Sequence, residues 1–214
     1  MLKSIYLKLA GILNKLPFNN SFKLRGTKLT YKGARLLKCK FDCNGKNNKI
    51  IIEKDALLRR CVFKIDGNNN TVHIGKNTIV NDTEFYLSDN NNNITLGDKT
   101  WICGKTNLNC LEGTTIKTGE ECLFSSEIVL RTSDSHSIMN SQNVRINKGA
   151  DIELGDHVWI GYHVMITKGV HIKDGSIVGT GSVVTKSFDK PNVVIVGVPA
   201  KVVKEDVTWS GERR

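Results

Sequence analysis

The sequence lacks the features of several protein classes. No run of about 18 apolar residues occurs, so we expect no membrane-spanning helix. The six cysteines lack the paired spacing of a zinc site, and we find no helix-turn-helix or aromatic-basic motif. We therefore expect no nucleic-acid partner and no metal. The cysteines are expected to be reduced thiols in the core of a cytoplasmic protein.

Length and charge limit the remaining classes. The 214 residues are enough for one large domain, and a hydrophobic content of 39% is too high for a disordered chain. The formal net charge of +10 favours an anionic partner. Nucleic acid, an acidic glycan, a phosphate-rich cofactor and lipid head groups are all anionic, and composition does not choose among them.

Residues 1–22 are expected to form an N-terminal amphipathic helix or cap. Between Leu2 and Leu16, apolar side chains fall three or four residues apart, with lysines among them. The segment has no small-residue cleavage site, so it is a poor signal peptide. Two alternatives remain: the helix caps the end of the main domain, or it makes a peripheral contact with the inner face of a membrane.

A period of six residues dominates the C-terminal half. The sixfold positions are all aliphatic: Leu154, Ile160, Ile166, Ile172, Val178 and Val184. This period fits a chain that turns a corner every six residues and points one aliphatic side chain inward from each face. Three faces make a coil of about 18 residues, and stacked coils make an all-β parallel β-helix. Glycine recurs just after the inward position, where we expect the backbone to bend and to tolerate no crowding.

The N-terminal half has a longer period. Ile52, Ile74, Leu96 and Thr118 follow one another at intervals of 22, and tracts rich in asparagine precede the first three. We interpret this as coils of about 18 residues with about four more at one corner, where Asn and Gly tolerate left-handed backbone.

Two segments leave the repeat. Residues 131–148, RTSDSHSIMNSQNVRINK, are polar and lack the sixfold spacing. Function usually lies in such an excursion. After a second departure at residues 188–192, Val196 is expected to resume the inward register. The β-helix domain is thus predicted over residues 23–198, with a short helix and tail over residues 199–214.

Three stretches resemble the hexapeptide-repeat acyltransferases: GDHVWIG at 155–161, GTGSVVTK at 179–186 and VGVPAK at 196–201. In that family the repeats wind a left-handed β-helix, an exception to the usual right-handed crossover. The stretches FSS at 124–126 and RTSDSHS at 131–137 are most similar to the O-acetyltransferases of capsular and sialic acid polysaccharides.

The resemblance implies a homotrimer that transfers acetyl from acetyl-CoA to a sugar hydroxyl of a surface polysaccharide or its precursor. The carbohydrate acceptor attacks the thioester directly. His136 is the expected general base, because a hydroxyl needs a proton acceptor and imidazole titrates near neutral pH. Asp134 or a main-chain carbonyl is expected to orient its ring. Trp159 is expected to point outward and to wall the acetyl-donor site at a subunit boundary.

The same resemblance assigns the donor-binding residues. Gly161, Gly179 and Thr180 are expected to pair their main chain with the pantetheine arm of CoA, and Thr180 stands where the family often has alanine. Lys186 and Lys201 are expected to meet the CoA phosphates.

Three other functions remain open at this point. An amino-sugar N-acetyltransferase would share the fold. A gamma-class carbonic anhydrase needs three histidines around zinc, of which His157 and His163 give a faint hint, although both are expected to be corner residues. A non-catalytic β-helix scaffold is the third alternative.

Overall fold

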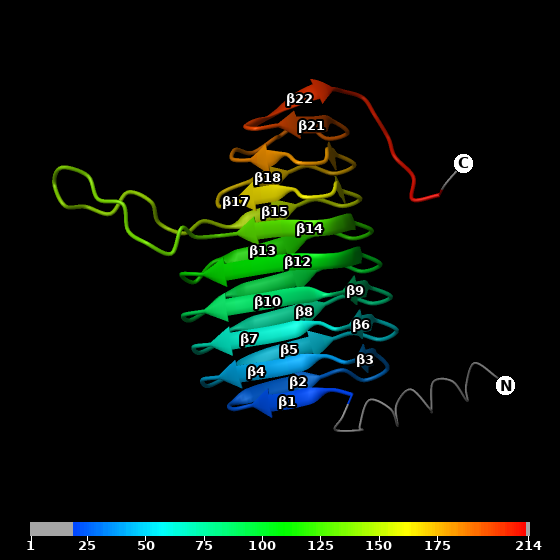
Figure 1. Ribbon diagram of the computed structural model, residues 1–214, viewed down its shortest axis with the longest axis vertical. Coiled ribbons are helices and arrows are strands. Elements are labelled where there is room, and N and C mark those ends of the chain that lie inside the picture. Colours follow the sequence, from blue (N-terminus) through cyan, green and yellow to red (C-terminus); the bar gives the residue numbers. More distant parts are fainter. Residues whose placement is uncertain (1–18, 213–214) are drawn as a thin grey trace.

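The computed structural model describes residues 19–212, which form one column of stacked strands (Figure 1). No α-helix occurs within this range. The predicted N-terminal helix lies almost entirely in residues 1–18, outside the described residues. The described part of the chain contains no helix long and apolar enough to cross a membrane.

Three walls make up the column. The first wall contains β3 (Arg35–Leu37), β6 (Leu57–Arg59), β9 (Ile79–Asn81), the start of β12 (Trp101–Leu111), the start of β14 (Leu123–Arg131), β16 (Trp159–Ile160), β19 (Ile177–Val178), β21 (Val194–Gly197) and β22 (Ala200–Lys204). The second contains β1 (Ser21–Leu24), β4 (Lys40–Asn44), β7 (Val62–Asp66), β10 (Thr83–Ser88), the ends of β12 and β14, β17 (Met165–Thr167) and β20 (Val183–Val184). The third contains β2 (Thr27–Thr30), β5 (Asn48–Ile52), β8 (Thr71–Ile74), β11 (Asn93–Leu96), β13 (Thr115–Thr118), β15 (Ile152–Leu154) and β18 (His171–Ile172).

Neighbouring coils are joined by parallel strand pairing on all three walls, except where β22 pairs antiparallel with β21. This solenoid fits the expected left-handed β-helix. We name its corners by the walls that they join: corner A joins the first and second, corner B the second and third, and corner C the third and first. The predicted inward residues from Leu154 to Val184 are all buried, which confirms the sixfold period.

The 22-residue period is also confirmed, and corner B holds the additional residues. Asn48, Asn70 and Asn92 are buried there in a ladder. The Oδ1 atom of Asn48 accepts a hydrogen bond from the Asn70 main-chain N at 2.9 Å, and Asn70 Oδ1 accepts one from the Asn92 main-chain N, also at 2.9 Å. The wider corner therefore holds a buried amide at each step, and this amide satisfies the backbone of the next coil.

Glycine after the inward position is explained by crowding and not by a bend. The bend lies two residues further on, at His157 and His163, whose φ angles are +54° and +56° and which are corner residues as predicted. At Gly161 a Cβ atom would lie 2.8 Å from the Thr180 main-chain N of the next coil. A larger residue there would push two coils apart.

Two predictions for the C-terminal end are wrong. Val178 pairs with Ile195, so Ile195 is buried and Val196 only half-buried, because the last coil is one residue shorter than the coil before it. The expected C-terminal helix is absent from the described residues. Ala200–Lys204 form β22 instead, because the edge of β21 at the end of the column offers unpaired backbone groups.

A ladder of phenylalanines fills the lower coils. The rings of Phe41, Phe63 and Phe85 stack with centroids 4.5 and 4.6 Å apart, and all three are fully buried.

We predict that Phe63→Ala lowers the free energy of unfolding by about 3–5 kcal/mol, because it leaves a cavity between two rings. Urea unfolding checks this value. Phe22→Ala, at the half-exposed end of the same stack, is the control. Equal losses in both variants would contradict the ladder as a core element.

Candidate active site

The excursion loop, residues 132–149, leaves the column at corner B and projects from it as a hairpin (Figure 1). Met139 and Arg145 form an antiparallel bridge, and the Ile146 main-chain N donates to the Ile138 main-chain O at 2.9 Å. Asn140 closes the tip, since its Oδ1 accepts a hydrogen bond from the Val144 main-chain N at 2.9 Å. The loop is thus an ordered arm.

Glu112 anchors this arm to the column. Its carboxylate accepts hydrogen bonds from Ser133 Oγ at 2.5 Å, from the Arg145 guanidinium at 2.7 Å and from the Gly149 main-chain N at 2.9 Å. Hydrogen bonding by Arg145, and then by Ser133, lowers the pKa of Glu112 to about 2. Sequence reasoning missed Glu112. The available signal was a carboxylate at a corner where the preceding coils carry Asn68 and Asn90.

Asn147 and Lys168 hold the base of the arm around His136. The buried Asn147 donates from Nδ2 to Asp134 Oδ2 and to the His136 main-chain O, both at 2.8 Å. Lys168 also bonds the Asp134 carboxylate, and its Nζ donates to the Asn147 main-chain O at 2.9 Å. Lys168, and after it Asn147, keeps the pKa of Asp134 below its ordinary value.

The His136 ring itself is exposed, and none of the described residues hydrogen-bonds it. Asp134 was an expected orienting partner for this ring. Its carboxylate bonds Asn147 and Lys168 instead, so it fixes the backbone of the loop and leaves both ring nitrogens accessible.

An apolar stripe runs along the arm. Four side chains on its two limbs are between 44% and 63% exposed, namely Ile138, Met139, Val144 and Ile146. Exposed apolar side chains gathered on one projection mark a surface that another molecule covers.

The first wall carries most of the predicted donor residues. Trp159 lies between two inward residues and points out of the column, as predicted. Gly161 and Gly179 stand on successive coils of the same wall, and Thr180 follows at corner A. The main-chain N of Gly161 donates to the Val178 O, and that of Gly179 to the Ile195 O, each at 2.8 Å. These two amides are therefore engaged in the fold.

The two predicted lysines lie on different sides of the column. Lys201 is exposed on β22, beside Val196 at the top of the first wall. Lys186 follows β20 at the end of the second wall, and its Nζ lies 5.9 Å from the centre of the Phe188 ring. Only Lys201 shares a wall with Trp159, Gly161 and Gly179.

Trp209 is a second residue that sequence reasoning missed. The tail after β22 runs back down the outside of the column (Figure 1), where the Val207 main-chain N donates to the Asn192 O. Trp209 stacks on the His157 ring with centroids 4.0 Å apart, and its Nε1 donates to the His157 main-chain O at 2.8 Å. Its ring lies 5.9 Å from that of Trp159. The tail thus gives Trp159 a cover within the same chain.

Trp159 Nε1 is buried and has no hydrogen-bond partner among the described residues. A buried N–H without an acceptor is unusual, because its desolvation is not compensated. This indole N–H is therefore a hydrogen-bond donor that the described residues leave unused.

One chain does not bring the predicted base and Trp159 together. The excursion loop that carries His136 leaves corner B, whereas Trp159 begins the first wall beyond corner C. The whole third wall separates them.

The two histidines that hint faintly at a metal site do not meet within one chain. His157 lies at corner C and stacks on Trp209, whereas His163 lies at corner A beside Glu127. In residues 19–212, no three His, Cys, Asp or Glu side chains converge as metal ligands. All six cysteines fall in this range and are free thiols, with only Cys103 exposed.

Fold and sequence together place the chain among known proteins. Residues 151–186 match the family described as bacterial transferase hexapeptide (six repeats). The chain is similar to the polysialic acid-specific acetyltransferase NeuO, whose crystal structure is known. The two sequences are 30% identical, the two structures superpose with a TM-score of 0.82, and the match covers 90% of this chain and 82% of that chain. The chain therefore belongs to the hexapeptide-repeat family of bacterial acyltransferases.

A second solved structure is similar in both respects. The polysialic acid O-acetyltransferase OatWY is 29% identical, with a TM-score of 0.77, and the match covers 91% of this chain and 92% of that chain. None of the curated protein sequences matches this chain.

We predict that Glu112→Gln loosens the excursion loop. Replacing the carboxylate removes the charge that Arg145 pairs with, so the amide of Ile146 should exchange its hydrogen on the order of tenfold faster than in the wild type. Because the pKa of Glu112 is lowered to about 2, its stabilising effect is complete above about pH 4.5 and is lost as the pH falls towards 2. The difference in unfolding free energy between the two proteins should therefore be present at pH 7 and largely absent near pH 2. An equal difference at both pH values would contradict this anchor.

We predict that Trp209→Ala exposes Trp159. In a Trp101→Phe background, the fluorescence of Trp159 should shift to longer wavelength and become more accessible to acrylamide. The unfolding free energy should fall by about 1 kcal/mol, the usual scale of an aromatic pair. Trp209→Phe, which keeps a ring, is the control. Unchanged quenching in Trp209→Ala would show that the tail does not cover Trp159.

Proposed function

We propose that this protein transfers an acetyl group from acetyl-CoA to a hydroxyl group of an acidic surface polysaccharide or its precursor. The observation that carries the proposal is the exposed ring of His136. Asn147 fixes the main chain of this residue where the ordered arm joins the column. Similarity to NeuO and OatWY, over about nine-tenths of the chain, supports an acidic polysaccharide as the acceptor. The net charge of +10 agrees with such an acceptor.

In the proposed reaction, His136 accepts the proton of the sugar hydroxyl as the oxygen attacks the thioester carbonyl. The C–S bond then breaks, and the imidazolium returns the proton to the departing CoA thiolate. Trp159 Nε1 is proposed to donate a hydrogen bond to the thioester of acetyl-CoA, because this N–H is buried and has no partner of its own. The pantetheine arm is proposed to lie along the edge at corner A. There it would face the carbonyl groups of Gly161, Gly179 and Thr180.

We propose a homotrimer as the active form. His136 and Trp159 lie at different corners of one column, so a complete site needs the arm of one copy beside the first wall of another. The apolar stripe on the arm is the surface that such a neighbour would cover. In that assembly Lys186 and Lys201, from different sides of the column, could both reach the CoA phosphates. Six free thiols fit a reducing compartment, so we place the enzyme in the cytoplasm.

We predict that His136→Ala lowers turnover of a sialic acid polymer by about 10²–10⁴-fold, the usual cost of losing a general base. Release of the CoA thiol measures the rate, and calorimetry should show acetyl-CoA binding close to that of the wild type. His73→Ala, at a partly exposed histidine of β8 on the third wall, is the matched control and should keep wild-type turnover. Activity above half of wild type in His136→Ala would exclude His136 as the base.

A further inference from the structure

Among the described residues, the excess of positive charge lies in the first coils. Residues 19–64 contain 13 lysines and arginines and three acidic residues, a net charge of +10. Residues 65–212 contain 13 lysines and arginines and 18 acidic residues, a net charge of −5. Among the lysines and arginines of residues 19–64, only Lys54, Arg60 and Lys64 form ion pairs. The N-terminal end of the column therefore presents many cations without a carboxylate partner.

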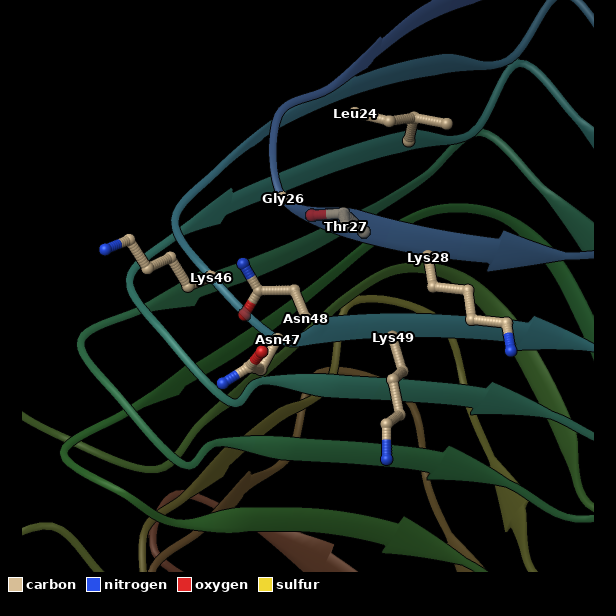
Figure 2. Close-up of a pocket in the computed structure, with 8 residues that line it drawn as sticks. All are labelled: Leu24, Gly26, Thr27, Lys28, Lys46, Asn47, Asn48 and Lys49. Atoms are coloured by element: carbon tan, nitrogen blue, oxygen red, sulfur yellow. The ribbon is translucent and has the colours of Figure 1, made fainter.

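Three of these lysines surround a hollow at corner B. The hollow is open and has a volume of about 810 Å³, and its lining comprises Leu24, Gly26, Thr27, Lys28, Lys46, Asn47, Asn48 and Lys49. Figure 2 shows Lys28 and Lys49 on neighbouring strands, with Lys46 at the turn beside them. The volume is within the range of about 300–1,000 Å³ that is usual for ligand sites. Three ammonium groups suit a ligand that carries carboxylates. We call this surface the basic hollow.

The basic hollow and the excursion loop lie on the same corner. Figure 1 shows the turns after β1, β4, β7 and β10 on the side from which the loop projects. On the third wall, β15 follows the loop and lies four strands above β5. At about 4.8 Å per strand, the two sites are roughly 20 Å apart along the column. Corner B carries the acidic residues Asp66 and Asp89 between the hollow and the loop. The attraction for an anion is therefore concentrated at the N-terminal end of the column.

We propose that the basic hollow is a second binding site for the acidic polysaccharide, separate from the site of acetyl transfer. A long polymer reaches both sites at once, so the hollow holds the chain while another sugar is presented to His136. A short acceptor reaches only one. This proposal rests on the proposed function, because the polymer is the acceptor.

A hydrated polyanion fits the basic hollow better than a lipid surface does. Peripheral membrane sites combine basic side chains with apolar side chains that enter the bilayer. In residues 19–64, Phe22 is the one large hydrophobic side chain exposed at this end of the column. The hollow itself is lined by three lysines, two asparagines, Gly26, Thr27 and a single apolar side chain, the half-buried Leu24.

The test compares two triple variants. Lys28→Gln/Lys46→Gln/Lys49→Gln removes the charge of the hollow. Lys32→Gln/Lys54→Gln/Lys76→Gln removes the same charge at corner C, from the same two coils and the next coil above them. With polysialic acid of graded length, the first variant should raise the KM for long chains on the order of tenfold, since each exposed ion pair contributes little. The increase in KM should become smaller as the polymer chains become shorter, and it should also become smaller at high salt. The corner C variant should behave like the wild type.

Binding of polysialic acid without acetyl-CoA, in the His136→Ala background, separates this proposal from the proposed function. If the wild type acetylates no sialic acid polymer but the hollow variant loses binding, the proposed acceptor fails and the binding site stands. Equal effects of the two triple variants, or an effect independent of chain length, would overturn the site. Loss of binding to phosphatidylglycerol vesicles, with polymer binding intact, would overturn it in favour of a membrane contact.

Discussion

Each coil of this protein has to close on three walls and still present its backbone to the coils above and below. That constraint needs a residue with left-handed backbone at every corner and one side chain that fills the centre from every wall. His157 and His163 meet the first condition and Leu154, Ile160 and Ile166 the second. Parallel hydrogen bonding then fixes the register, so any additional residues must leave the column at a corner.

Corner B is where this freedom is used. In the lower coils it takes about four additional residues and satisfies them with the buried ladder from Asn48 to Asn92. At the excursion loop it takes 18 residues, and Glu112 replaces the asparagines as the anchor. The same corner thus carries the basic hollow and the proposed base. The number of coils between the basic hollow and His136 determines the distance between these two sites along the column.

The repeat could be predicted from sequence because it depends on local, periodic choices of side chain. Inward residues, corner histidines and the 22-residue period followed from spacing alone. The one-residue shift at Ile195 did not, because Val196 is equally aliphatic and pairing with β19 decides between them. β22 was predicted as helix because its pairing partner, the open edge of β21, is visible only in the fold.

The candidate site was predictable only in part. His136 and Trp159 carried motif signals, but their positions at different corners depend on how the coils divide among the walls. Glu112 and Trp209 act through contacts 33 and 52 residues away in sequence, which no local pattern contains. The column and its corners place these groups, and the proposed chemistry requires that two copies meet.

The central claim is acetyl transfer to a sugar hydroxyl, and the fate of a labelled acetyl group tests it most directly. Wild-type protein would be incubated with isotope-labelled acetyl-CoA and a panel of acidic polysaccharides, and mass spectrometry would follow the label before and after mild alkali. We expect label on a sialic acid polymer that alkali removes, as an ester requires. Label that resists alkali would show transfer to an amine, and no label on any glycan would contradict the proposed activity.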